Sequence, residues 1–448
     1  MRRLPIILLM LILGVGAGSI IGCRSIRPKE KRKLVIIGID AGTWTLIKPL
    51  LQENKLPNLQ KLIEQGSSGP LTTFKVTKIS PVLWASILTG KKPEQHGITG
   101  FISARGFPVN STVRKVKDLA ELLSEAGYSV GFVGFWSSWP AEKVSGEMVS
   151  DLLSLGRYKD TSAQANAATM DYSYLMKLHQ VTYPEELLKE IYPVLLTPKQ
   201  VPREDFSRLA LFNDQEWERF ENDNLLSRED VESLLKFSYV SDLNFERVAL
   251  YLAENKKPEA LAVYFEGADI VGHFFWKYME PQYFSAVPAR EVERFHDTYR
   301  NYYQALDGFI GQLMKVSGPD TAFLIISDHG MIRVPREGLD ANHSGTHARG
   351  RPPGIFIFSG PGIKKSAEPI KGAGLLDITP TVLYYLGLPV AEDMPGKVLT
   401  QVFSDEFLAK NPLRKIRTYD RKPRRVKEEQ SPLDQEIINK LRSLGYVR

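Results

Sequence analysis

Four of the seven histidines in this 448-residue chain stand in three short segments: EGADIVGH (266–273), SDHG (327–330) and NHSGTH (342–347). Asp269 and His273 are four residues apart, so a helix would place both on one face. Imidazole nitrogens combined with carboxylate oxygens form the donor set of zinc and similar divalent ions. The segments therefore predict a metal site. The candidate ligands are Asp269, His273, Asp328, His329, His343 and His347.

Two further candidates stand earlier in the chain. Asp40 ends the run LVIIGID at 34–40, whose apolar and β-branched residues predict a buried strand. Ser80 precedes a proline and an apolar run, which predicts a short helix over 82–89 with Ser80 as its cap. A serine that faces the free N–H groups of a helix start is suited to lose its proton and to act beside a bound anion. Ser80 is therefore the candidate nucleophile, and Thr77 is its rival.

Strand-like apolar runs alternate with amphipathic helical runs along most of the chain. This alternation favours a parallel sheet covered by helices on both faces. The carboxyl ends of its strands, where such folds carry their chemistry, would meet at one edge. We expect an α/β fold, a three-layer α/β/α sandwich with a mainly parallel mixed sheet. Strands are predicted at 34–40, 128–135, 260–266, 321–327 and 355–363, and helices at 56–66, 113–126, 228–254, 288–316 and 375–386.

The composition changes between residues 147 and 235, where charged residues, Tyr and Pro are frequent and short helical pieces alternate with polar turns. We interpret 147–235 as an inserted cap over a catalytic core that comprises 34–146 and 236–402. The segment 403–448 is a charged C-terminal tail that ends in a short amphipathic helix. A chain of this length is ample for one large core with an insert.

The first 22 residues contain two arginines, an apolar stretch and small residues, which is the layout of a secretory signal peptide. The single cysteine, Cys23, follows at the cleavage position and resembles the lipobox cysteine of bacterial lipoproteins. The resemblance implies a signal peptide over 1–22, a lipid-attached basic linker over 23–33, and a location in the bacterial cell envelope facing the periplasm or exterior. An uncleaved signal anchor is the alternative, because residues 4–22 are just long enough to span a bilayer.

The formal net charge is +6, and the basic residues are concentrated near the two ends of the chain. Basic ends of this kind are more typical of solvated or membrane-proximal segments than of sequence readers. We therefore expect no nucleic-acid recognition.

The candidate residues come in an order that resembles the alkaline phosphatase superfamily. The resemblance is closest to its type I phosphodiesterase/nucleotide pyrophosphatase-like branch and to the bacterial phosphohydrolase–phosphomutase proteins. Further motifs carry it across most of residues 34–400: GIDAGTW (38–44), LTGKKPEQHGI (88–98), FIFSGPGI (356–363) and LLDITPTVLYYLGLP (375–389).

The resemblance implies a metal-dependent phosphohydrolase that cleaves phosphodiesters or phosphomonoesters through a phospho-serine at Ser80. It also implies two divalent ions, with zinc favoured and manganese as the alternative. A pair of ions can hold both the attacking and the leaving oxygen of a phosphoryl transfer. One ion would be held by Asp40, Ser80, Asp328 and His329, and the other by Asp269, His273 and His347.

The chain departs from the family pattern in two places. Nucleotide pyrophosphatases usually have Thr at the nucleophile position, where this chain has Ser80. They also have an Asn after the HGI motif, where this chain has Phe101 and Ile102, and this argues against a nucleotide substrate. A sulfatase would need Cys or Ser followed by x-Pro-x-Arg, and this chain reads Ser-Pro-Val-Leu-Trp.

Two other functions stay open. The first is a phosphotransferase that moves the phospho group to a glycan or lipid acceptor. The second is a catalytically silent lipoprotein that binds partners in the cell envelope.

Overall fold

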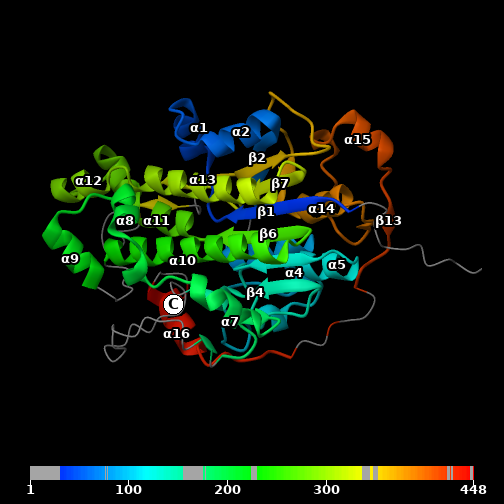
Figure 1. Cartoon of the computed structure of the whole chain (residues 1–448), viewed down its shortest axis with the longest axis horizontal. Helices are drawn as coiled ribbons and strands as arrows, with labels where there is room; N and C mark the ends of the chain where they lie inside the picture. Colours follow the sequence, from blue (N-terminus) through cyan, green and yellow to red (C-terminus); the bar gives the residue numbers. More distant parts are fainter. Residues whose placement is uncertain are drawn as a thin grey trace, which may run out of the picture.

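The computed structural model of the chain is built around one nine-stranded β-sheet (Figure 1). The strand order is β11-β2-β10-β7-β1-β6-β3-β4-β5, so the first strand of the chain lies at the centre. The structure describes residues 31–75, 77, 79–154, 175–176, 178–222, 230–334, 344–346, 352–420, 424, 427–443 and 447. The strands of the sheet are β1 (Lys33–Ile39), β2 (Gly66–Thr72), β3 (Val130–Val133), β4 (Gly146–Val149), β5 (Thr182–Tyr183), β6 (Ala260–Phe265), β7 (Thr321–Ile326), β10 (Gly354–Ser359) and β11 (Ala373–Gly374).

The central strands of the sheet are parallel. β1 pairs in parallel with β6 on one side and with β7 on the other. β3 is parallel to β6 and β4, whereas β10 is antiparallel to β7 and β2, so the predicted mainly parallel mixed sheet is confirmed. Ile39 of β1 lies opposite Phe265 of β6, and Gly38 lies opposite Ile326 of β7. The residues that follow these three strands consequently emerge side by side at one edge.

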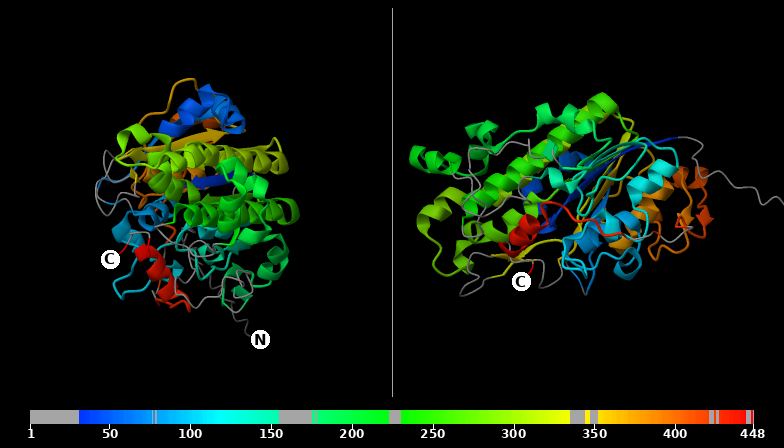
Figure 2. Two further views of the ribbon diagram at one scale, coloured as in Figure 1. Left: turned by 90° about the vertical axis from the view of Figure 1, so that its left-hand side faces the viewer. Right: turned by 90° about the horizontal axis from the view of Figure 1, so that it is seen from below.

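Helices cover both faces of the sheet, which confirms the predicted three-layer arrangement (Figure 2). Along β1, Val35 and Ile37 join the core on one face, while Leu34 and Ile36 join the core on the other. A strand buried on both faces needs such a continuous apolar run. The first face carries α1 (Trp44–Gln52), α2 (Pro57–Gln65), α10 (Val231–Tyr251), α11 (Gly267–Met279) and α13 (Thr298–Ser317), and the second carries α3 (Ser80–Thr89), α5 (Leu119–Glu125) and α14 (Ile378–Tyr385).

Two helices differ in extent from the prediction. The predicted helix 113–126 is α-helical only within α5, because Asp118 caps the helix by accepting a hydrogen bond from the N–H of Glu121. The predicted helix 288–316 is two helices, α12 (Ala289–Phe295) and α13.

β2 has the sequence GSSGPLT, which is typical of a turn and is not among the predicted strands. Its glycines are required by the close approach of neighbouring backbone. A Cβ atom on Gly66 would lie 2.1 Å from the carbonyl oxygen of Phe358, and one on Gly69 would lie 2.7 Å from that of Ile370. Antiparallel pairing with β10 therefore makes a strand out of a sequence with low strand propensity.

The region 147–235 begins within β4 and also provides β5 at the edge of the sheet. Part of the predicted insert therefore extends the sheet itself. Short helices follow, and one of them, α8, packs against α13. These helices are α7 (Leu187–Ile191), α8 (Arg203–Leu209) and α9 (Asp214–Asn222).

The last part of the chain crosses the molecule from one end to the other. α15 (Asp405–Lys410) lies near the amino ends of the parallel strands, and α16 (Asp434–Ser443) lies toward the opposite end (Figure 1). There Leu433 and Ile437 pack against Trp139. Among the described residues, no helix has both the length and the apolar character needed to cross a membrane. Smaller elements are α4 (Pro93–His96), β8 (Ile332–Arg333), β9 (Gly345–Thr346), β12 (Val390–Ala391) and β13 (Lys415–Ile416).

Candidate active site

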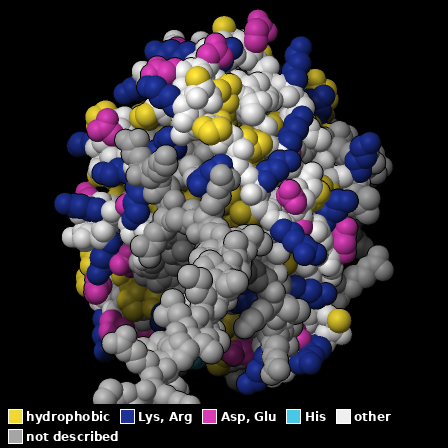
Figure 3. Space-filling view, turned by 90° about the vertical axis from the view of Figure 1, so that its right-hand side faces the viewer, with side chains coloured by type: hydrophobic (Ala, Val, Ile, Leu, Met, Phe, Trp, Pro, Cys, Tyr) yellow, Lys and Arg dark blue, Asp and Glu magenta, His cyan; other side chains and the backbone are white. Residues whose placement is uncertain are grey.

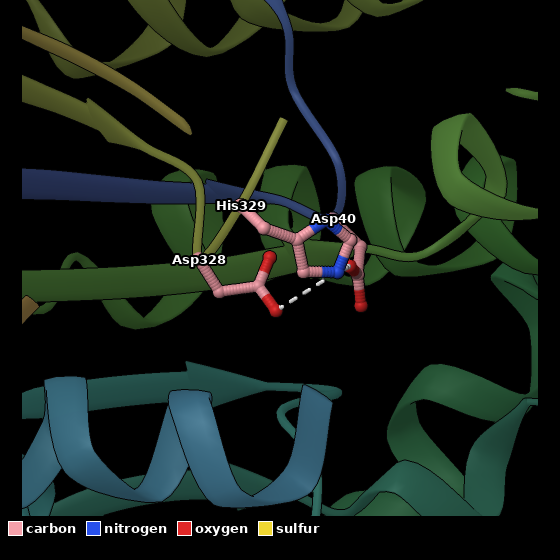
Figure 4. Close-up of side chains that lie close together, drawn as sticks. All are labelled: Asp40, Asp328 and His329. Carbon is pink, nitrogen blue, oxygen red and sulfur yellow. Dashed lines mark ion pairs between the residues drawn. The ribbon is translucent and has the colours of Figure 1, made fainter. Parts of the chain in front are cut away.

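Three side chains meet where two neighbouring central strands end (Figure 4). Asp40 directly follows β1, and Asp328 and His329 follow β7 after one residue. The Nε2 atom of His329 lies 3.3 Å from Oδ1 of Asp40 and 3.5 Å from Oδ2 of Asp328. The possible ligand atoms of all three residues lie within 4.8 Å of one another, and the three side chains are buried. One metal ion could therefore contact all three.

The backbone determines which nitrogen of His329 faces the carboxylates. Its Nδ1 atom lies 3.1 Å from the carbonyl oxygen of Gly330, which can only accept a hydrogen bond, so Nδ1 carries a proton in this contact. When the ring is neutral, Nε2 then presents its lone pair to Asp40 and Asp328. A lone pair that faces two carboxylates is unfavourable unless a cation or a bound proton lies between them, and a histidine held in this way is typical of metal ligands.

Asp269 and His273 repeat this arrangement on the first two turns of α11. The Nδ1 atom of His273 lies 2.9 Å from the carbonyl oxygen of Gly345, and its Nε2 atom lies 3.3 Å from Oδ1 of Asp269. The i, i+4 spacing does place both side chains together, as predicted. Both side chains are buried, so this pair is a second candidate for holding an ion.

The start of α11 is fixed by residues that the sequence motifs do not reveal. Asp242 of α10 accepts hydrogen bonds from the N–H groups of Glu266 and Gly267, at 2.9 and 3.0 Å, and from the hydroxyl of Tyr302 at 2.8 Å. A Cβ atom on Gly267 would lie 1.7 Å from that hydroxyl, so only glycine fits there. These contacts determine where the first turn of α11, which carries Asp269, lies relative to the sheet.

Ser80 lies beside Asp40, but its position in the helix differs by one residue from the prediction. It is the first residue of α3, and Ile79 is the N-cap, so the prediction that Ser80 is the cap is wrong. Its Oγ atom donates a hydrogen bond of 3.5 Å to Oδ1 of Asp40. The side chain is 8% exposed. The hydroxyl of Thr77, by contrast, has no hydrogen-bond partner among the described residues.

Burial and crowding of negative charge shift the acidities in this site. Burial, together with the charge of Asp269, raises the pKa of Asp40 from 3.8 to about 7. Burial and the charge of Asp40 raise the pKa of Asp328 well above its ordinary value. Burial alone would lower the pKa of His273, but Asp269, the carbonyl oxygen of Gly345 and the charge of Asp40 together outweigh burial and raise it. The pair of Asp269 and His273 is thus close enough to Asp40 for their charges to interact.

The residues present fit a divalent cation. Both buried carboxylate oxygens of Asp328 lack a hydrogen bond of ordinary geometry from any described residue. Within the described part of the chain, neither Asp328 nor Asp40 forms an ion pair with Lys or Arg. Buried carboxylates without countercharge are costly, and a bound cation would remove that cost.

Tyr264 is a further residue at this site that the sequence motifs do not reveal. It lies in β6, and its hydroxyl donates a hydrogen bond to Oδ2 of Asp40. The one available signal is a polar aromatic residue near the end of an otherwise apolar strand.

The last candidate ligands, His343 and His347, lie outside the described residues. Their described neighbours lie against α11. The N–H of Ser344 donates to the carbonyl oxygen of His273 at 2.6 Å, and Gly345 makes the contact with the imidazole described above.

A second acidic group lies elsewhere in the molecule and has its own countercharge. Asp118, Glu121 and Glu142 also place carboxylate oxygens within 4.8 Å of one another. The guanidinium of Arg114 lies 3.2 Å from Asp118 and 2.8 Å from Glu121 and also contacts Glu142. Arg424 pairs with Glu121 at 3.1 Å and with Glu142. We call these five residues the arginine cluster.

The sequence profile of the type I phosphodiesterase/nucleotide pyrophosphatase family matches residues 34–346. The match covers more than half of the chain and ends one residue before His347. No curated protein matches the chain. The described candidates inside the matched stretch are Asp40, Ser80, Asp269, His273, Asp328 and His329.

Several solved structures resemble this one at low sequence identity. The alkaline phosphatase PafA is 12% identical, with a TM-score of 0.49 over 84% of this chain and 99% of that chain. A 2-O GAG sulfatase is 15% identical, with a TM-score of 0.48 over 83% and 74% of the two chains. A phosphonoacetate hydrolase from Sinorhizobium meliloti 1021, in complex with phosphonoformate, is 14% identical, with a TM-score of 0.38 over 68% and 57%. With TM-scores below 0.5, these likenesses carry no weight for the function.

Proposed function

Because this chain belongs to the type I phosphodiesterase/nucleotide pyrophosphatase family, we propose that it is a metal-dependent phosphohydrolase. Its substrates are phosphodiesters or phosphomonoesters, and the reaction passes through a phospho-serine at Ser80. The observation that carries this proposal is the buried cluster of Asp40, Asp328 and His329, which has Ser80 at its edge and no Lys or Arg paired with its carboxylates among the described residues.

The donor set supports two divalent ions, with zinc favoured and manganese as the alternative. When bound, they would supply positive charge that favours ionisation of the serine hydroxyl and offsets charge on the phosphoryl oxygens. One ion would be held by Asp40, Ser80, Asp328 and His329, and the other by Asp269, His273 and His347.

Ser80 acts as the nucleophile in this proposal. Its Oγ atom forms a bond to phosphorus while the bond from phosphorus to the ester oxygen breaks, and the alcohol leaves. Water then attacks the phospho-serine, releases phosphate or a phosphomonoester, and restores the serine.

The test is metal analysis of the purified full chain, combined with hydrolysis of bis-p-nitrophenyl phosphate, p-nitrophenyl phosphate and p-nitrophenyl sulfate. We expect about two ions per chain and turnover of at least one phosphate ester but not of the sulfate. Ser80→Ala should abolish turnover and keep most of the bound metal, whereas Thr77→Ala should keep both.

Other outcomes point to the other functions. Full metal occupancy without turnover, but with transfer of phosphate to an added acceptor alcohol, would replace hydrolysis by phosphotransfer. A chain that binds no metal and hydrolyses nothing would overturn the proposal in favour of a silent binding protein. Loss of activity in Thr77→Ala with activity retained in Ser80→Ala would reassign the nucleophile.

We also propose that the chain is exported to the cell envelope and anchored through a lipid on Cys23. Attachment through the segment before β1 would bring the side of the molecule where β1 begins toward the membrane (Figure 1). That side carries many Lys and Arg side chains, with Asp and Glu among them (Figure 3). The candidate site lies at the other ends of the same strands. The intact mass of the protein purified from membranes tests the anchor. A chain that starts at a lipid-modified Cys23 supports it, and a chain that keeps residues 1–22 would favour the uncleaved signal anchor.

A further inference from the structure

We infer that Tyr264 is a positioning residue for Asp40, and that Trp136 in turn fixes the hydroxyl of Tyr264. This inference rests on the proposed function, because it assigns both residues a role toward the same bound ion. The structural basis is a chain of two hydrogen bonds that runs from the indole of Trp136 through the phenol of Tyr264 to the carboxylate of Asp40.

The two oxygens of the Asp40 carboxylate have different surroundings. Oδ1 lies 3.3 Å from Nε2 of His329 and 3.5 Å from Oγ of Ser80, so it faces the candidate site. Oδ2 accepts the hydrogen bond from the hydroxyl of Tyr264 on the other side. A carboxylate held in this way offers one oxygen to an ion and cannot rotate without losing the bond to the tyrosine.

The direction of the chain follows from its donors. The Nε1 atom of Trp136 lies 2.8 Å from the hydroxyl oxygen of Tyr264, and an indole N–H can only donate. The single proton of the phenol is therefore available for Asp40, which accepts it. Each group in the chain thus has one orientation, and the carboxylate receives a hydrogen bond that needs no rearrangement when an ion binds.

Packing holds the phenol ring in place. Tyr264 is fully buried, and its ring lies edge-on to that of Trp84, with centroids 5.0 Å apart and an interplanar angle of 77°. The centroid of the Phe135 ring lies 5.6 Å from the centroid of the Tyr264 ring. Trp84 belongs to α3, the helix that begins with Ser80, so one aromatic cluster fixes both the nucleophile's helix and the support of Asp40.

Trp136 also contacts Phe101, which stands where nucleotide pyrophosphatases have an Asn after the HGI motif. Its ring lies edge-on to that of Phe101, with centroids 5.6 Å apart. The hydrogen-bonded chain therefore connects Asp40 with the HGITGF segment on which the sequence departs from the nucleotide pyrophosphatases. Outer residues that orient metal ligands typically contribute about 10–100-fold to metal affinity or activity.

The inference is tested by zinc affinity, measured by competition with a chromophoric chelator, in the full chain and in Tyr264→Phe, Trp136→Phe and the double variant. We expect Tyr264→Phe to bind zinc about 10–100-fold more weakly and Trp136→Phe to show a smaller loss. Because Trp136 acts through the phenol, its substitution should have no further effect once Tyr264 is phenylalanine. Tyr128→Phe is the matched control, since it removes a fully buried hydroxyl that donates to the carbonyl oxygen of Leu386, at 2.8 Å.

The outcomes separate this inference from the proposed function. Normal zinc binding in the full chain, with Tyr264→Phe no weaker than Tyr128→Phe, would overturn the positioning role and leave the proposed function standing. If the losses of zinc affinity in the two single variants add up fully in the double variant, the part played by Trp136 would be overturned. A wild-type chain that binds no zinc or manganese would overturn both. If Tyr264→Phe does not fold, Trp136→Phe alone decides, and unchanged zinc affinity in that variant would count against the inference.

Discussion

Among the described residues, two groups of closely spaced acidic side chains differ in where their countercharge comes from. The first comprises Asp40 and Asp328 with His329, and the second is the arginine cluster. Both bring their oxygens within 4.8 Å of one another. In the arginine cluster, burial alone would raise the pKa of Glu121, but Arg114 and Arg424 outweigh burial and lower it. In the first group no Lys or Arg of the described residues offsets the effect of burial, and the pKa of Asp40 is raised to about 7.

Close spacing of carboxylates does not by itself distinguish a metal site from a structural ion-pair network. Geometry alone would make both groups candidates for a metal ion. The arginine cluster contains two guanidinium groups of its own, although burial still raises the pKa of Asp118 within it, and we interpret the cluster as structural. The first group is complete only with a cation from solution, or with bound protons in its place.

The largest expected effect concerns activity. Asp328→Asn should lower kcat/KM by at least about a thousandfold, because it removes a ligand and the charge that attracts the ion. Glu142→Gln, the matched change in the arginine cluster, should alter kcat/KM by less than about threefold, as its site plays no part in the reaction. Steady-state kinetics with a phosphate ester measure both. Equal losses in the two variants would end the distinction between the clusters.

The next effect concerns stability. Arg114→Met should lower the free energy of unfolding by about 3–5 kcal/mol, because it leaves buried carboxylates without their main partner. The bound metal should be unchanged. Arg333→Met removes a partly exposed pair with Glu280 and should lower the free energy of unfolding by no more than about 1 kcal/mol. Urea denaturation compares the variants, and a tolerated Arg114→Met would show that the cluster does not depend on this countercharge.

A smaller effect should appear in the pH dependence of stability. The folded-state pKa of Asp40, about 7, lies above its ordinary 3.8, so the folded protein binds this proton more tightly than the unfolded chain does. The stability that this proton supplies is fully present below about pH 4 and is lost as the pH rises to about 7. The raised pKa of His273 acts in the same direction.

Zinc should compensate for this loss, because it takes the place of the protons. The stabilisation by saturating zinc, measured by urea denaturation with zinc or with a chelator, should therefore grow between pH 5 and pH 7.5, by roughly 3 kcal/mol. A zinc effect that is constant across this range would contradict the assignment of Asp40 as a ligand.

The smallest effect should come from the outer arginine of the second cluster. The side chain of Arg424 is 30% exposed, whereas that of Arg114 is 5% exposed. Water can hydrate the carboxylates that Arg424 would leave unpaired, so Arg424→Met should lower the free energy of unfolding by about 1 kcal/mol. A thermal or urea unfolding series with Arg114→Met and Arg424→Met tests the order, and a larger loss for Arg424 would reverse our view of which cation holds the cluster.

The sequence is informative wherever function follows from local position. Asp40 and Asp328 could be predicted because each stands just after an apolar strand, and Asp269 with His273 because of helical spacing. The parallel core was predictable for the same reason, since each strand is a continuous apolar run.

The missed features all depend on register between distant segments. Tyr264 supports Asp40 only because β6 pairs with β1, and Asp242 caps α11 only because α10 packs there. β2 is a strand only because β10 lies beside it. No pattern within a single segment contains that information. The offset of Ser80 from the cap to the first helical residue is a boundary error of the ordinary size.

The central place of β1 also has a consequence for the order in which the protein is made. Asp40 and Tyr264 are 224 residues apart, and Glu142 and Arg424 are 282 residues apart. At about 5–20 residues per second, synthesis would reach Tyr264 roughly 10–45 s after Asp40. During that time β1 has neither of its neighbouring strands, β6 and β7, so the sheet cannot form strand by strand in the order of synthesis. The candidate site therefore cannot be complete before β6 and β7 have been synthesised, because Asp40 meets Tyr264, Asp328 and His329 only then.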